Sequence, residues 1–115
     1  MAIELHEFQL ILLRRPEGAP DYDDETAARI QREHLAFYAA LREDGRVVTN
    51  GPVLRQPDEA LRGMAIFAMA SVEEAGALAQ TDPAVRAGRL EVVAMTWLCP
   101  PRTMVRDGTP VTVGG

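Results

Sequence analysis

The sequence has little of several patterns that mark particular classes of protein. Cys99 is the only cysteine, so no disulfide can form within the chain and nothing favours an oxidising compartment. The net charge is −5 and no basic run is longer than Arg14-Arg15, so we expect no nucleic-acid partner. The first apolar run is too short for a signal-peptide core or a spanning helix, which predicts a cytoplasmic protein that does not enter a membrane.

Patterns typical of metal and cofactor sites are missing as well. His6, His34 and Cys99 are far apart in the sequence, whereas the ligands of a zinc site are closely spaced. No Gly-x-Gly-x-x-Gly or Walker-type glycine pattern is present to hold nucleotide phosphates. We therefore expect no metal and no cofactor.

The composition indicates one globular domain. The chain has 115 residues, of which 47% are hydrophobic and 25% are charged, and this length supports a single core. We expect the domain to span residues 1–101. Residues 102–115 form an extension that is expected to be a hairpin, an arm that crosses a dimer, or a tail.

Periodicity and turn signals predict four strands and two long helices. The strands are expected at residues 8–15, 46–53, 63–70 and 90–98. Helices are expected over 25–44 and from the capping box Ser71-Val72-Glu73-Glu74, with a helical turn from Asp82-Pro83 to about Ala87. The order βαββαβ predicts an α+β, ferredoxin-like fold in which both helices cover one face of an antiparallel sheet. Since residues 63–70 are almost wholly apolar, we expect the other face to be covered in a homodimer.

His34 stands in the apolar stripe of the first expected helix, about 40° from Ile30 around the helix axis. A histidine turned toward a core needs a hydrogen-bond partner, because an unpaired buried polar group costs about 1–3 kcal/mol. The residues alone leave two interpretations open, a structural core histidine or a functional one.

Asp82 is the candidate partner on chemical grounds. A carboxylate can hold one tautomer of a histidine and stabilise its charged form, and such a pair can act in general acid–base catalysis. The sequence does not place Asp82 near His34, and Asp82-Pro83 is also the expected pattern of a helix cap followed by proline. Both the capping role and the catalytic role stay open at this point.

Two segments, HLAFYAALREDGRVVTNGPV (34–53) and TDPAVRAGRLEVVAMTW (81–97), resemble the signature regions of the YCII-related (YciI-like) family. The resemblance implies a ferredoxin-like fold of the dimeric α+β barrel type, with a histidine and an aspartate that meet in a cleft. These two residues fall on His34 and Asp82, and the family's Gly-Pro falls on Gly51 and Pro52. The acidic loop 16–25 and the extension after Pro101 depart from the shorter family members, and either segment is a candidate cover for the cleft.

Two functions follow as hypotheses. The first is a cofactor-independent enzyme, isomerase-like or lyase-like, in which His34 moves a proton of a small organic molecule and Asp82 orients the imidazole. The alternative is a non-catalytic dimer that binds a small molecule or serves as an accessory domain. A functional polar group in an apolar stripe predicts that His34→Leu is tolerated or stabilising while activity is lost.

Other side chains carry weaker expectations. Arg14 or Arg15 could hold a substrate carboxylate, although both are more simply solvated or paired with the acidic loop. Tyr38 is expected to pack rather than to reach the cleft, and His6 is expected to be exposed. A further set is expected to fill the interior: Met64, Met69, Met95 and Trp97.

Overall fold

The computed structural model describes residues 1–114 and has the predicted ferredoxin-like order of elements. The strands are β1 (His6–Arg14), β2 (Val47–Pro52), β3 (Leu61–Phe67) and β4 (Glu91–Cys99). The helices are α1 (Asp24–Glu43), α2 (Val72–Ala79) and the short α3 (Pro83–Arg86). The strands form one sheet in the order β2-β3-β1-β4, and every neighbouring pair is antiparallel. The α+β fold class expected from the sequence is confirmed.

The ends of the helices are set by short-range hydrogen bonds. The side chain of Asp23 accepts a hydrogen bond from the backbone of Thr26 at the start of α1, and Gly45 takes a positive φ of 83° just after its end. The hydroxyl of Ser71 accepts a hydrogen bond from the Glu74 amide at the start of α2, as the capping box predicts. These caps explain why the observed helices begin and end within about one residue of the expected positions.

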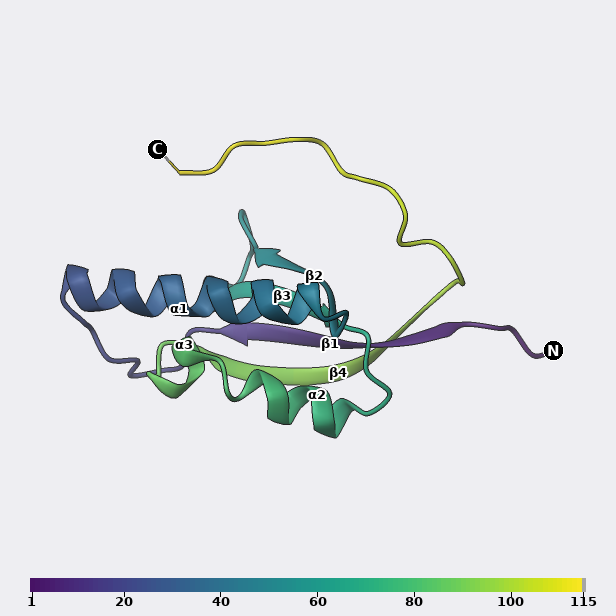
Figure 1. Ribbon diagram of the computed structural model, residues 1–115, viewed down its shortest axis with the longest axis horizontal. Coiled ribbons are helices and arrows are strands. Elements are labelled where there is room, and N and C mark those ends of the chain that lie inside the picture. Colours follow the sequence, from purple (N-terminus) through teal and green to yellow (C-terminus); the bar gives the residue numbers. More distant parts are fainter. Residues whose placement is uncertain (115) are drawn as a thin grey trace.

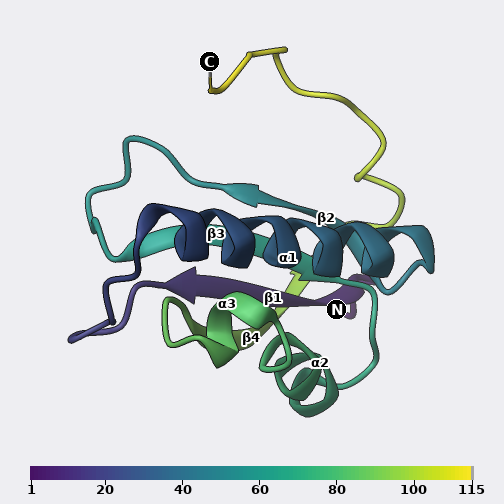
Figure 2. The ribbon, with the colours of Figure 1, turned by 60° about the vertical axis from the view of Figure 1, so that its left-hand side comes forward.

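The core lies between the sheet and the helices, which cover one face of it in both views (Figures 1 and 2). Tyr38 and Leu41 of α1 pack against buried side chains of β1 and β3, including Ile11 and Phe67. The facing residues of α2 are small, and a Cβ added at Gly76 would lie 3.5 Å from that of Ala94 on β4. Small residues therefore bring α2 close to the sheet.

The other face of the sheet has no helix over it (Figure 2). Along β4, Val93, Met95 and Trp97 are each more than a third exposed. The expectation that Met95 and Trp97 fill the interior is wrong for this single chain, because alternate residues of β4 point away from the helices. Apolar side chains are thus left uncovered on this face.

The segment after Pro101 forms neither helix nor strand within residues 102–114. It turns back from the end of β4 (Figure 1), and Val113 lines the cavity described below. The division of the chain at residue 101 stays a prediction. Among residues 1–114, no helix is long and apolar enough to span a lipid bilayer.

Candidate active site

His34 and Asp82 lie side by side although they are 48 positions apart in the sequence. His34 projects from the middle of α1, and Asp82 stands directly before α3, which packs against α1. The ring atom Nδ1 of His34 is 2.7 Å from Oδ2 of Asp82, and Asp82 is fully buried. The histidine side chain keeps 14% of its exposure, so the pair has one buried end and one end open to solvent.

Asp82 uses both of its carboxylate oxygens. While Oδ2 meets His34, Oδ1 accepts a hydrogen bond of 2.9 Å from the backbone N–H of Ala84. Pro83 occupies the first position of α3, where its missing N–H leaves no donor unpaired. The capping role and the role as partner of the histidine are therefore not exclusive, because one carboxylate fills both.

The contact with Asp82 fixes the orientation and tautomer of His34. A carboxylate oxygen accepts hydrogen bonds, so Nδ1 of the ring carries the N–H that donates to it. The second ring nitrogen, Nε2, then carries a lone pair in the neutral imidazole. Because Asp82 occupies Nδ1 and His34 lines the cavity, we infer that Nε2 is the nitrogen available to a bound molecule.

Tyr38 forms the inner wall behind this histidine. Its ring is fully buried and meets the ring of His34 edge to face, with centroids 5.3 Å apart. Its hydroxyl makes no hydrogen bond to any residue between 1 and 114. Burial, and then the negative charge of Asp82, raise the pKa of Tyr38, so its hydroxyl stays protonated. Tyr38 packs in the core, as expected, and does not line the cavity.

The cavity beside His34 has a volume of about 530 Å³, enough for a small organic molecule. It lies where α1 passes over the ends of β2 and β3, and Gly51 and Pro52 belong to its lining. A Cβ added at Gly63 would lie only 3.1 Å from the backbone oxygen of Gly51. The missing side chain at Gly63 therefore lets β2 and β3 approach closely at the edge of the cavity.

Residues 8–97 match the model of the YCII-related domain. The chain belongs to the YCII-related family. No curated protein matches this chain. Among solved structures, a 5-chloro-2-hydroxyhydroquinone dehydrochlorinase from Burkholderia phenoliruptrix AC1100, in complex with 2,5-dihydroxybenzoquinone, is similar with a TM-score of 0.57 and 20% identity. That similarity covers 78% of this chain and 92% of the other, and at this identity it shows the fold alone.

The lining of the cavity in this YCII-related chain carries positive charge. Arg15 follows β1, Arg62 lies on β3 and Arg89 precedes β4, and all three line the cavity. Arg15 was a candidate from the sequence, whereas Arg62 and Arg89 were missed. No local pattern marks them, because each is a single arginine in an ordinary strand or loop and only the sheet brings them to one end.

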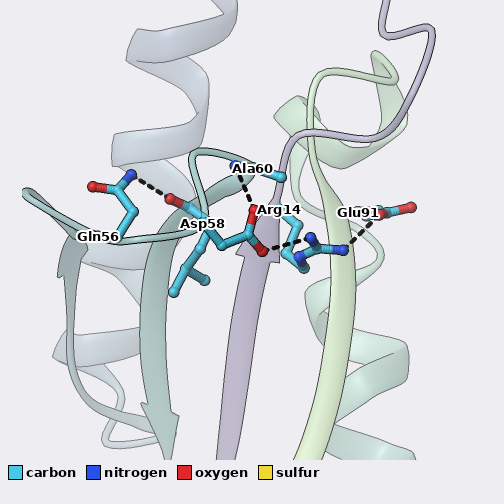
Figure 3. A network of polar contacts seen from close by, with 6 residues as sticks. Arg14, Gln56, Asp58, Ala60 and Glu91 are labelled. Atoms are coloured by element: carbon cyan, nitrogen blue, oxygen red, sulfur yellow. Dashed lines mark hydrogen bonds and ion pairs between the residues drawn. The ribbon is translucent and has the colours of Figure 1, made fainter.

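Arg14 has a structural explanation instead. Its guanidinium lies 2.7 Å from a carboxylate oxygen of Asp58 and 3.8 Å from one of Glu91 (Figure 3). The hydrogen bond from Arg14 and one from the Ala60 backbone lower the pKa of Asp58. Gln56 of the same loop donates a hydrogen bond to the backbone oxygen of Leu61 at the start of β3 (Figure 3). Through its ion pair with Asp58, Arg14 thus holds loop 53–60 of the YCII-related domain against the sheet, and it does not line the cavity.

The remaining candidates lie away from the cavity. His6 is half exposed beside Glu4, and Cys99 is buried at the end of β4. Within residues 1–114, no group of three or more His, Cys, Asp or Glu side chains is placed to hold a metal ion. The expectations that the YCII-related chain uses neither metal nor cofactor stay predictions.

Proposed function

We propose that this YCII-related chain is an enzyme that carries out acid–base chemistry on a small organic molecule without a cofactor. One observation supports this most strongly, the 2.7 Å contact between His34 Nδ1 and the fully buried Asp82 carboxylate at the edge of a cavity. In this proposal Nε2 of His34 removes a proton from the substrate, and Asp82 stabilises the imidazolium that forms. The C-terminal extension, which places Val113 at the same cavity, covers the bound substrate.

The reaction class that fits is an isomerisation or an elimination. Both reactions begin when a base removes a proton. An isomerisation ends when the base returns the proton at another position, and an elimination ends when a leaving group departs. The structurally similar protein is named a dehydrochlorinase and holds a dihydroxybenzoquinone, which supports elimination from a ring compound as the first reaction to test. Proton transfer by a positioned side chain contributes about 10²–10⁴-fold in rate.

The test is a search for proton exchange catalysed by the protein. Hydroxylated quinols and small enolisable acids are incubated in deuterium oxide, and deuterium uptake and conversion are followed by NMR. We expect His34→Gln to lose about 10²–10⁴-fold of any activity found. His6→Gln is the matched control, because His6 is the only other histidine and lies outside the cavity. A His34→Gln protein that keeps the full rate on a compound converted by the wild type would overturn the assignment.

We further propose that the chain is a homodimer whose subunits meet through the uncovered face of the sheet, and that it works in the cytoplasm. The exposed apolar side chains of Val93, Met95 and Trp97 on β4 support the dimer, since a single soluble chain rarely leaves such a group uncovered. Light scattering with size exclusion should give the mass of two chains, and Trp97→Glu should give the mass of one. A monomeric wild type at working concentrations would refute this part of the proposal.

A second candidate function is supported by the cap that Asp82 provides to α3. If the pair with His34 serves only to stabilise the fold, the cavity can bind a metabolite without changing it. Under this alternative, His34→Gln lowers the free energy of unfolding and weakens ligand binding, but no compound is converted by the wild type. The deuterium-exchange experiment separates the two functions, because binding alone moves no proton.

A further inference from the structure

The charge around the cavity is opposite to the charge of the chain. The whole sequence has 17 acidic and 12 basic residues, a net charge of −5. Among the described residues that line the cavity, however, there are three arginines and one histidine, and none is Asp or Glu. Charged walls of one sign around a recessed space concentrate the electric field there. The cavity is therefore a local site of positive potential on an acidic protein.

The arginines at the cavity have few partners of opposite charge. Arg62 and Arg89 form no ion pair or side-chain hydrogen bond with any residue between 1 and 114. Arg15 approaches Asp21 only at 3.5 Å, and that aspartate side chain is 99% exposed, so solvent weakens their attraction. By contrast Arg14, outside the cavity, has two carboxylates within 4 Å.

The single negative charge of Asp82 can offset at most one of the three arginine charges. Asp82 is fully buried behind His34, and its two oxygens are occupied by the imidazole and by the Ala84 amide. The positive charges of three arginines that line one cavity repel one another, and an anion bound among them lowers that cost. A guanidinium also presents paired N–H donors that match the two oxygens of a planar oxyanion.

We propose that the cavity binds a small organic anion, a carboxylate or an ionised phenol, whose charged oxygens are held by Arg15, Arg62 and Arg89. Its apolar part lies against Leu13 and Leu90, which share the lining, and reaches His34. The inference rests on the proposed function in one respect: removal of a proton by His34 leaves negative charge on the substrate, and the same arginines stabilise that charge. The binding of the anion itself does not depend on turnover.

The experiment measures binding of three ring compounds of similar size by NMR titration, with the signals of the His34 ring and the arginine side chains as reporters. Benzoate represents the carboxylate, 4-nitrophenolate at about pH 8 represents the ionised phenol, and benzamide is the neutral match to benzoate. We expect one of the two anions to bind at least about tenfold more tightly than benzamide at low salt, with the difference shrinking at about 0.3 M salt. Which anion binds more tightly identifies the charged group of the substrate class.

Single arginine replacements test the residues. Arg89→Gln and Arg62→Gln should each weaken the anion about 5–10-fold and change benzamide binding by less than about twofold. Arg86→Gln is the matched control, because it removes the same charge from an exposed position on α3 that does not line the cavity. If Arg62→Gln does not fold, as an amide spectrum will show, Arg15→Gln takes its place.

Two results of the binding experiment would overturn the inference. One is equal binding of the anions and benzamide, which includes no detectable binding of either anion at about 10 mM. The other is an equal loss of anion binding in Arg86→Gln and Arg89→Gln, which would reduce the effect to net charge. Failure of the proposed function is distinguishable, because the wild type should then still bind the anion although it converts no compound. Turnover of an uncharged substrate alone would refute the anion site and leave the role of His34 intact.

Discussion

Replacing His34 by leucine tests whether the contact with Asp82 contributes to the free energy of unfolding. The position lies in an apolar stripe, and the sequence predicts that leucine is tolerated there or stabilises the fold. The structure predicts the opposite, because the partner of His34 is a fully buried carboxylate. Without the imidazole, that carboxylate keeps only its hydrogen bond from the Ala84 amide. We therefore expect His34→Leu to lower the free energy of unfolding.

The expected magnitude follows from burial and distance. Leaving a buried polar group without its hydrogen-bond partner costs about 1–3 kcal/mol, and more when the group is charged, so loss of the imidazole from the buried Asp82 carboxylate should cost about 3 kcal/mol. Leucine on the same stripe recovers about 1 kcal/mol through apolar burial. The net loss should be about 2 kcal/mol. The variant Asp82→Asn keeps an oxygen for the Ala84 amide, so in the double variant most of the loss from an unpaired charge disappears.

The assay is urea unfolding of the wild type, the two single variants and the double variant at pH 7 and 25 °C. All four are measured at one protein concentration, because dimerisation would make stability depend on concentration. The cycle should give a coupling energy of about 1.5–3 kcal/mol between His34 and Asp82. A His34→Leu protein at least as stable as the wild type, or a coupling below about 0.5 kcal/mol, would refute the reasoning.

Four further outcomes are expected. Tyr38→Phe should raise the free energy of unfolding by about 1 kcal/mol in urea titrations at pH 8, because it removes a buried hydroxyl that has no partner among residues 1–114; a loss of stability would show that the hydroxyl is bonded. Burial and the charge of Asp82 raise the pKa of Tyr38, so the folded protein keeps this proton while the unfolded tyrosine ionises above about pH 10. The wild type should therefore lose stability above about pH 10 faster than Tyr38→Phe. Gly63→Ala should lower stability by about 1–3 kcal/mol in thermal unfolding, because its Cβ would lie 3.1 Å from the Gly51 oxygen. An unchanged midpoint of thermal unfolding would mean that β2 shifts to accommodate the added methyl group. Ser71→Ala should cost about 1 kcal/mol through loss of the cap on α2 and leave ligand binding unchanged, whereas weaker binding would link α2 to the cavity.

The order of the elements and the ends of the helices could be predicted because their signals are local. The bounds of β3 were less well predicted, since it runs over Leu61–Phe67 and not over the expected 63–70. The cap at Ser71 and the glycine after α1 both lie within one turn of the boundary that they set. The exposure of Met95 and Trp97 could not be predicted in the same way, because a strand rich in apolar residues does not say which face the helices cover. The direction of alternation along β4 is decided by its pairing with β1.

The candidate site could be predicted only in part. Asp82-Pro83 indicates a cap from local chemistry, and the cap is present. The contact of Asp82 with His34 came from the family resemblance, because no local rule joins residues 48 positions apart. Arg62 and Arg89 could not be found at all, since their common position depends on the register of three strands and on the cavity below α1.

The shortness of α3 makes the candidate site easier to open than the sheet beneath it. The four-residue helix is held by the cap at Asp82 and by a hydrogen bond from the Tyr22 hydroxyl to the Ala87 carbonyl. A local opening of residues 82–87 would withdraw the carboxylate from His34 and leave all four strands paired, so the pair can break at a lower free energy than the whole fold. Hydrogen exchange at the Ala84 amide reports that opening directly. Because Ala84 and His34 both line the cavity, a ligand that touches both would hold the segment closed and slow this exchange.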